Sequence, residues 1–592
     1  MTVDDGAGRP TVTLPGAGTS EGEADGDAPR VVRRPVRTEP APVARRDVAT
    51  IVLAIACGVM LLAVLSTAVS ATAVGLADGA RVNGDEAVAA MLPLEFARGA
   101  PALLFPGNPY QGILETPVYA VAWQVFGPSL TPLRLFHLVL WIAGVGVWAW
   151  LGMDLVRRRT GLPVRSRWWG AFAVVGLLLV TSAAGWPSFF RIYPGYQLGA
   201  LLAGLALVTA SRARTWIGWG GAGVLAGLAI YGQPMHLGVV VAVGVAALVG
   251  RGLGAEADAD ADTPTLGRPG RSLGLGGRLL AVAVGGVVGA SPLLLWNVRN
   301  DLDTFRLGEQ PVQHPEWGYG DRLYNTFRQT GRILWGDDPT RFPGWAVPLR
   351  ALVAVVLVGL VAFGAVRLAR AGRAAWPLLT AIVVALLALP VLQTFSLETD
   401  SRYANAWWAA LGALVAVGAA SVAALRPTGL RRALLAVLVL AVASQVAMSV
   451  HSGVDALDRR TSAPSAESLT ADLAHDLRRC GVDVVVGDYW GVYPSVWGSD
   501  GELRGEVLYG PDRMESIHPD SYPRARRLAV IAPAGVTIDE SERTATTDTG
   551  RGAGGWVSVT HPPTGTVLAL ERTATPLPAG CIGPSGFRAT TP

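Results

Sequence analysis

The sequence predicts an all-α polytopic membrane protein that carries a small α/β domain at its C-terminal end. The first observation is composition: 51% of the 592 residues are hydrophobic and 16% are charged, whereas soluble proteins carry about 25% charged residues. The second is a series of long apolar runs. The third is the segment 451–592, where polar helical stretches alternate with short apolar strands.

Eleven apolar runs predict eleven transmembrane helices, since a span needs about 20 apolar residues. A cleaved signal peptide is excluded for the first run, because the run is too long and a polar segment precedes it. The runs lie near residues 50–74, 131–154, 168–186, 195–210, 215–231, 235–250, 278–297, 346–366, 374–393, 404–424 and 432–450.

The arginines support this topology, because cytoplasmic loops are enriched in basic residues. With eleven spans every arginine cluster falls in the cytoplasm, so the N-terminus is inside and the C-terminal domain is outside the cell membrane. Counting residues 112–127 as a full span would place the arginine cluster at 157–167 outside. We therefore interpret residues 112–127 as a helix that lies along the outer interface. The clusters are 30–46, 157–167, 212–214, 251–278, 367–373 and 426–432.

The domain organisation follows from these patterns. Residues 1–47 are rich in Gly, Pro and acids and predict a disordered cytoplasmic N-terminus. Residues 48–450 form the transmembrane domain, with an external loop at 78–130, and residues 451–592 form the extracytoplasmic α/β domain.

The α/β domain begins with a predicted helix that ends at Gly481, followed by a buried strand at 482–486. RRLAVIAP and GTVLALERT predict further strands. Cys480 and Cys581 both lie here, and an oxidising compartment permits a disulfide; two cysteines alone leave the pairing open. Cys57 lies inside the first predicted span, where a packing role is expected.

An acidic pair, Asp85 and Glu86, follows the first span in RVNGDEAVAAMLPLEFARG. One interpretation is that the pair caps and solvates a short interfacial helix starting at Gly84. The other is a functional site, because an amphipathic stretch and a Pro/Gly-rich turn lead to a third carboxylate, Glu115, set among apolar residues. That spacing predicts that all three acids fold onto one outer rim.

Two arginines, Arg191 and Arg402, fall in external loops, where positive charge is disfavoured. A guanidinium binds phosphate oxygens in pairs, so both are candidates for a phosphate site. Arg191 could instead snorkel to lipid headgroups, and Arg402 could pair with Glu398 or Asp400.

Aromatic and histidine side chains accompany these arginines. Tyr193, Tyr196 and Tyr403 are candidates for substrate contact, or members of an interfacial aromatic belt. His236 follows a Pro break in YGQPMHLG and is either a substrate-binding or a packing residue.

Two other groups of residues are weaker candidates. Asp488, Tyr489 and Trp490 end a predicted strand, where open α/β sheets commonly bind ligands, although the aromatic pair could equally be core or docking residues. His314 and Glu316 do not define a metal site without further ligands, and no metal site is predicted.

The external loop resembles that of a known family. GDEAVAAMLPLEFARG, then PYQGILETPVYAVAWQVFGPS, then LRLFHLVLW resemble the first external loop of GT-C glycosyltransferases, nearest to bacterial relatives of protein O-mannosyltransferases and the lipid A aminoarabinose transferase. GDYWGVYPSVW followed by SYPRARRLAVIAP resembles the terminal domain of an uncharacterised bacterial branch. One departure is that FFRIYPGYQ offers no clear second Asp in the next external loop.

The resemblance implies a hexosyl- or pentosyltransferase of the cell envelope that uses a polyprenyl-phosphate sugar and inverts the anomeric carbon. Asp85 is the implied general base, and Glu86 and Glu115 would orient hydroxyl groups. The acceptor is a protein, a glycan or a lipid, and no nucleic acid is expected. No cofactor is implied, although a divalent metal is used by some enzymes of this architecture.

Two other classes remain open. A transporter or lipid flippase would place acids and cations near the middle of its spans and would show repeated halves. The predicted spans are nearly free of charge, with Asp154 the nearest exception. A non-catalytic assembly protein presenting residues 451–592 would leave the acidic pair unexplained.

Overall fold

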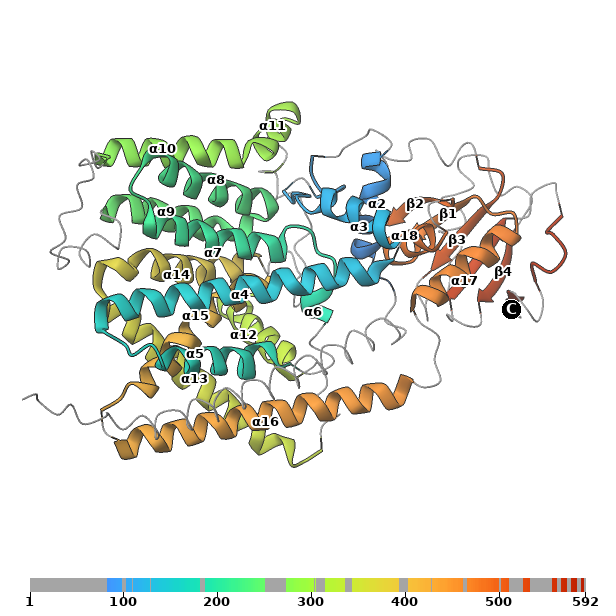
Figure 1. The fold of residues 1–592 in the computed structure, drawn as a ribbon. Helices are drawn as coiled ribbons and strands as arrows, with labels where there is room; N and C mark the ends of the chain where they lie inside the picture. The colour runs from blue at the N-terminus through green and yellow to red at the C-terminus, as the bar shows by residue number, and fades with distance from the viewer. Residues whose placement is uncertain are drawn as a thin grey trace, which may run out of the picture. The chain divides into compact units, whose positions relative to one another are not determined.

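A computed structural model of the chain defines the fold (Figure 1). It describes residues 82, 84–97, 103–108, 110–127, 129–181, 187–250, 273–302, 304, 315–335, 343–392, 403–426, 428–460, 466–499, 502–509, 525–532, 556–561, 566–571, 576–582 and 587–589. The predicted disordered segment 1–47, the first predicted span and Cys57 lie outside these residues.

Helices coincide with each predicted span that falls within the described residues. The bundle consists of α4 (Leu130–Thr160), α5 (Ser166–Val174) with the π-turn Val175–Leu179, α7 (Tyr196–Arg212), α8 (Trp216–Gly232), α9 (Leu237–Val249), α10 (Leu275–Gly289), α11 (Ser291–Arg299), α12 (Tyr319–Trp335), α13 (Ala346–Arg370), α14 (Trp376–Leu392), α15 (Ala404–Ala423) and α16 (Thr428–Arg460), with the short α6 (Pro187–Phe190) before α7.

Within the described residues, three helices are long and apolar enough to cross a membrane alone: α4, α13 and the Thr428–Val454 part of α16. The pair α10–α11 passes the same test together but is bent by 64°. Helices α5, α8, α9, α14 and α15 contain shorter apolar stretches. A helical membrane fold is therefore confirmed, while the number of eleven spans stays a prediction.

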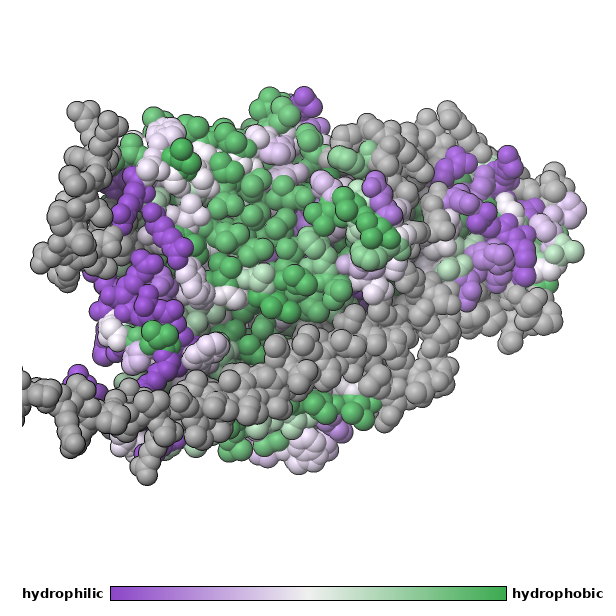
Figure 2. Space-filling view, in the orientation of Figure 1, coloured by the Kyte–Doolittle hydropathy of each residue, from purple (hydrophilic) through white to green (hydrophobic). Residues whose placement is uncertain are grey.

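The bundle presents an apolar exterior (Figure 2). Hydrophobic side chains gather over the described helices, whereas hydrophilic ones gather at one end of the bundle and over the C-terminal domain. Large exposed apolar residues include Ile217, Leu248 and Val287. Contiguous apolar surface of this kind suits a membrane rather than water.

Local sequence explains how the bundle elements begin, end and pack. Helix α4 begins after Ser129, whose Oγ accepts a hydrogen bond from the Thr131 amide at 3.3 Å, and it ends at Gly161 with φ +63°. These are favourable N- and C-terminal caps. Helices α8 and α10 can approach closely because Gly223 and Gly285 have no Cβ. A Cβ at either position would collide with a backbone carbonyl of the opposite helix.

The loop predicted to be external contains two helices, α2 (Gly84–Ala97) and α3 (Thr116–Phe126), and between them a bridge joins Leu104 and Gly112. Helix α3 has only 11 residues, too few to cross a bilayer. Val121 and Val125 lie on its exposed face. This amphipathic arrangement fits the predicted interfacial helix.

The C-terminal segment folds as helices around a mixed sheet with strand order β2-β1-β3-β5-β4-β6. Strand β1 runs parallel to β2 and β3, and the other pairs are antiparallel. The elements are α17 (Ala466–Arg479), β1 (Val484–Asp488), α18 (Tyr489–Gly498), β2 (Arg504–Tyr509), β3 (Leu528–Ala532), β4 (Trp556–His561), β5 (Thr566–Glu571) and β6 (Arg588–Ala589).

The predicted helix does end near Gly481, which has φ +79°, and the three predicted strands correspond to β1, β3 and β5. Strands β2, β4 and β6 were not predicted, and β1 lies two residues later than expected. Cys480 and Cys581 form a disulfide with a Cα–Cα distance of 4.9 Å, which answers the open question of their pairing. Helix α16 continues beyond the expected boundary at 450, to Arg460.

Candidate functional site

Glu86 of α2 forms a buried ion pair with Arg134 of α4. Arg134 Nε donates to Glu86 Oε1 at 2.9 Å, and Nη2 donates to Oε2 at 2.7 Å. The Ile192 amide donates to Oε1 at 3.3 Å. Both side chains are almost completely inaccessible. This bidentate geometry is the strongest that a guanidinium and a carboxylate form, so Glu86 is firmly anchored.

The electrostatics of Glu86 reflect this partner. Burial alone would raise the pKa of Glu86, but the charge and hydrogen bonds of Arg134 more than offset burial and hold the pKa below its ordinary value. Arg191 lowers the pKa of Glu86 further. Arg191 therefore lies close enough to the acid site to act on it, and the charged form of Glu86 is favoured.

Asp85 occupies the first turn of α2, where the helix dipole favours an acid. Its exposed fraction is 3%, and that of Glu86 is 0%. Neither acid is solvated at an exposed helix end, so the simple interpretation of the pair as a solvated cap is wrong. Asp85 is a buried carboxylate adjacent to an anchored ion pair.

Glu115 stands directly before α3 and is also buried. Its Oε1 accepts a hydrogen bond from the Gly195 amide at 2.7 Å, whereas Oε2 has no hydrogen-bond partner among the described residues. Burial raises the pKa of Glu115 to about 7, because the Gly195 amide offsets only part of the desolvation. A carboxyl group of this kind can hold or release a proton near neutral pH.

Three segments meet around Glu115. The Gln111 side chain donates to the Pro194 carbonyl at 2.8 Å, and the Gly112 amide donates to the Tyr231 carbonyl at 2.8 Å. Gly195 has φ +80°, and a Cβ there would collide with the Gly232 carbonyl. Only glycine permits this backbone conformation and this close approach, so the turn before α7 places its amide against Glu115.

A second polar chain runs beside the ion pair. Tyr119 Oη hydrogen-bonds to His137 Nε2, and His137 Nδ1 lies 3.0 Å from Gln197 Oε1. Gln197 in turn donates to the Phe189 carbonyl at 3.2 Å. Burial, and then the charge of Glu115, raise the pKa of Tyr119 well above its ordinary value, so the phenol stays neutral.

Sequence reasoning missed Arg134 and His137. A usable signal was present, because two polar side chains three residues apart on an otherwise apolar helix share one face. Both lie in LRLFHLVLW, which was noted only for its family resemblance. The residues that they contact lie in distant segments of the chain, so the sequence did not show which residues Arg134 and His137 would contact.

The predicted tyrosines lie together. Tyr193, Tyr196 and Tyr403 form one buried cluster with Met235. The ring centroids of Tyr193 and Tyr196 are 5.9 Å apart, and those of Tyr196 and Tyr403 are 6.0 Å apart. Tyr193 and Tyr196 flank Gly195, whose amide contacts Glu115.

His236 adjoins this cluster. Its ring hydrogen-bonds to the backbone of Tyr196 and lies against Gly199, where a Cβ would approach the ring to 2.5 Å. Nε2 is buried and has no hydrogen-bond partner among the described residues. His236 is thus a tightly packed residue with one free ring nitrogen beside the tyrosines.

The remaining candidates are less informative. Arg402, with its alternative partners Glu398 and Asp400, and His314 lie outside the described residues. Asp488 ends β1 and Tyr489 begins α18, but the side chains of this stretch, Trp490 included, also lie outside. Within the part of the chain that the structure describes, no three His, Cys, Asp or Glu residues are grouped to hold a metal ion.

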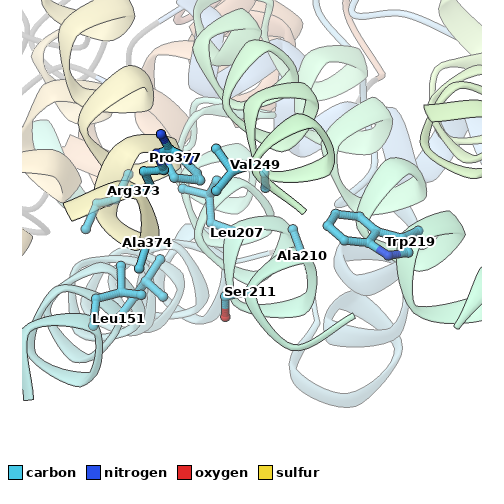
Figure 3. A pocket seen from close by; sticks show the side chains of 12 residues that line it. Leu151, Leu207, Ala210, Ser211, Trp219, Val249, Arg373, Ala374 and Pro377 are labelled. Carbon is cyan, nitrogen blue, oxygen red and sulfur yellow. The ribbon is translucent and has the colours of Figure 1, made fainter. Parts of the chain in front are cut away.

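A separate apolar pocket lies at the other end of the bundle (Figure 3), between α4, α7, α8, α9 and the start of α14. Leu151, which lines it, follows Arg134 by 17 residues on α4, or about 26 Å at 1.5 Å per residue. Apart from Ser211 and Arg373 the lining is apolar. This pocket is not part of the acid site.

No protein-family model and no curated protein matches the sequence. The fold is similar to the crystal structure of ArnT from Cupriavidus metallidurans in the apo state, with 15% identity over 90% of this chain and 100% of that one, at a TM-score of 0.52. ArnT bound to undecaprenyl phosphate aligns at a TM-score of 0.48, with 14% identity over 89% of this chain and 99% of that one. The chain therefore has the fold of ArnT, which is a lipid A aminoarabinose transferase of the GT-C type, as the family resemblance predicted.

Proposed function

We propose that this protein is a membrane-embedded glycosyltransferase that moves a sugar from a polyprenyl-phosphate donor to an acceptor hydroxyl on the outer face of the cytoplasmic membrane. The observation that carries the proposal is that Asp85, Glu86 and Glu115 are three buried carboxylates of one loop, with Glu86 and Glu115 bound to the Ile192 and Gly195 amides of one short segment, in a chain with the fold of ArnT. Buried, unequally tuned acids are typical of active sites.

The proposed chemistry is a single displacement with inversion. The acceptor oxygen bonds to the anomeric carbon, the bond between that carbon and the phosphate oxygen breaks, and the lipid phosphate leaves with the electron pair. Asp85 takes the proton of the hydroxyl as general base. Glu86 is poorly suited to this step, since Arg134 binds both of its oxygens and lowers its pKa. We assign Glu86 to holding α2 and Arg134 in place.

Glu115 is the second candidate for the base and, in this proposal, a group that orients hydroxyls. Its Oε2 is the available acceptor, because Oε1 is engaged by the Gly195 amide. Thr116 Oγ1 beside it is also buried without a hydrogen-bond partner among the described residues. A carboxyl group next to a hydroxyl suits the recognition of sugar hydroxyls.

The donor phosphate and the sugar need other groups. Arg191 is close enough to act on Glu86 and offers a guanidinium at the edge of the site, and Arg402 remains a proposed second cation. Tyr193, Tyr196 and Tyr403, with His236 beside them, supply an aromatic wall next to the turn that holds Glu115. A lipid-linked donor fits because nucleotide sugars are cytoplasmic, and the acceptor is a protein, glycan or lipid hydroxyl. No step is routed through a metal.

The proposed topology keeps the boundaries expected from the sequence: a cytoplasmic segment 1–47, a transmembrane domain 48–450 and an extracytoplasmic domain 451–592. A transporter or flippase is the alternative. It is less well supported, because the polar residues of α4 nearest the acids are already engaged: Arg134 pairs with Glu86, and His137 bonds Tyr119 and Gln197.

The test is transfer of labelled sugar in native membranes. A panel of radiolabelled polyprenyl-phosphate sugars would be supplied to wild type, Asp85→Asn and Asp154→Asn, and released lipid phosphate counted. Asp154 is the matched control, since it lies at the other end of α4 and pairs there with Arg158 at 2.7 Å. We expect one donor to be consumed, with turnover about 10²–10⁴-fold lower in Asp85→Asn and unchanged in the control.

Two outcomes contradict parts of the proposal. If Asp85→Asn keeps full turnover, the base lies elsewhere and Glu115→Gln is tested next. If wild type consumes none of the donors while an acceptor extract is present, the glycosyltransferase assignment fails and transport of a lipid becomes the better hypothesis. The donor that reacts identifies the sugar.

A further inference from the structure

Helix α2 is buried around its whole circumference from Asp85 to Leu92. Ala87, Val88, Ala89 and Ala90 are all 0% exposed, and Met91 and Leu92 are nearly so. Consecutive residues of a helix point in every direction, so burial of the whole run requires neighbours on all sides. Arg134 and the Ile192 amide engage Glu86, and other elements pack against the remaining faces of the helix.

Helix α3 supplies part of this cover, and α18 of the C-terminal domain supplies another part, from a segment far along the chain. Helices α2 and α18 belong to one hydrophobic cluster. Trp123 of α3 also stacks at a tilt on Trp497 of α18, with ring centroids 5.4 Å apart. The cluster joins Val82, Val88, Met91, Leu92, Phe105, Ile113, Tyr119, Leu130 and Leu133 of the loop region to Leu473, Leu477, Tyr493, Val496, Trp497 and Leu503 of the C-terminal domain.

We infer that the C-terminal α/β domain is a positioning element of the acid site, in which α18 holds α2 and thereby sets the placement of Asp85. An isolated helix of 14 residues is only marginally stable in water. Helix α2 also contains Pro93, which removes a backbone hydrogen bond and weakens it further. Its shape and position therefore come from the surfaces that enclose it, and α18 supplies a large share of them.

The C-terminal domain is built to present α18 rigidly. Strand β1, which pairs with β2 and β3 on either side, leads directly into α18, so the sheet fixes where the helix starts. The Cys480–Cys581 disulfide closes a loop of sequence separation 101, and the Arg527 guanidinium hydrogen-bonds to the Cys480 carbonyl. A rigid support matters because a displacement of about 1 Å at a catalytic group can lower the rate on the order of 10²-fold.

The first arm of the test does not depend on activity. Ala89→Cys places a reporter thiol on buried α2, in a Cys57→Ser background, and a membrane-impermeant maleimide measures its accessibility. Trp497→Ala and Trp123→Ala each remove one partner of the stacked pair. Val486→Ala is the matched control, because Val486 is fully buried in the cluster on the other face of the sheet, with Val484 and Leu528.

We expect the reporter to be labelled at least tenfold faster in both tryptophan variants and at the parental rate in Val486→Ala. Unchanged labelling in both tryptophan variants overturns the inference. Resistance of the Cys480–Cys581 disulfide to reduction reports whether the domain is still folded. If Trp497→Ala makes the disulfide reducible, the labelling result of Trp123→Ala is used instead, because that change leaves the sequence of the C-terminal domain intact.

The second arm rests on the proposed function. In the donor assay, both tryptophan variants should lower kcat about tenfold while the donor KM stays within about twofold, because α2 moves but the donor contacts remain. Unchanged kcat in both variants overturns the inference even if wild type is active. If wild type turns over no donor while the labelling result holds, the proposed function fails and the positioning role stands.

Discussion

Glu86 and Glu115 are two carboxylates of one loop, both fully buried, yet their electrostatics are opposite. Arg134 holds the pKa of Glu86 below its ordinary value, whereas burial raises the pKa of Glu115 to about 7 because backbone amides, that of Gly195 among them, offset burial only in part. Burial is equal at the two positions, so the partner decides the charge. One acid anchors the loop, and the other stays able to bind a proton.

The largest expected effect comes from breaking the ion pair. Arg134→Ala leaves Glu86 buried without its cation, which costs about 3–5 kcal/mol of unfolding free energy. Thermal and denaturant unfolding of the detergent-solubilised protein would measure the loss, with Arg165→Ala, an exposed arginine, as the control. The double variant Glu86→Leu/Arg134→Met should recover much of the stability, since neither charge remains. A loss in Arg134→Ala no larger than in the control contradicts an anchoring role.

Glu115 should make stability depend on pH. Its folded pKa of about 7 exceeds the ordinary value of 4.5, so the folded protein retains a proton that the unfolded chain releases between those values. Its contribution to stability is full below about pH 4.5 and is lost as the pH rises through about 7. The total is roughly 3 kcal/mol.

Glu115→Gln mimics the protonated form and should remove this part of the pH dependence, making the variant more stable than wild type at pH 8. Unfolding midpoints of both proteins between pH 4.5 and pH 8 would show it. Parallel curves would mean that Glu115 is ionised throughout and that the contrast with Glu86 does not hold.

Tyr119→Phe tests the polar chain that lies between the two acids. The change removes the hydroxyl bonded to His137 and leaves a buried ring nitrogen without that partner. The expected loss is about 1–3 kcal/mol, read from the same unfolding measurements. Tyr319→Phe is the comparison, since the exposed Tyr319 hydroxyl bonds only the Leu387 carbonyl among the described residues, and it should change stability little. Equal losses would show that His137 finds another partner.

The smallest effect is expected at an exposed ion pair. Comparing it with the buried Glu86–Arg134 pair shows how much the energy of an ion pair depends on burial. Arg478 of α17 pairs with Glu502, and their side chains are 49% and 56% exposed. Because water screens such pairs, Arg478→Ala should cost at most about 1 kcal/mol. A loss of stability as large as that of Arg134→Ala would contradict the view that burial makes the Glu86–Arg134 pair important for stability.

The sequence by itself determined the class and the candidate region. Apolar length and the distribution of arginine predicted the helical membrane domain, and alternation of apolar strands with a polar helix predicted the α/β domain. The acids were found because carboxylates at the edge of a span are conspicuous. These properties are local, since each depends on a short window of residues.

Tertiary structure alone decided which groups surround Glu86 and Glu115. Arg134 is 48 residues from Glu86, and Gly195 is 80 residues from Glu115; no local pattern relates such positions. The same holds for α18 against α2, where a helix near the C-terminus covers one near the start of the chain. A carboxylate acquires its pKa and its role from the groups that surround it in space, and those neighbours exist only once the chain has folded.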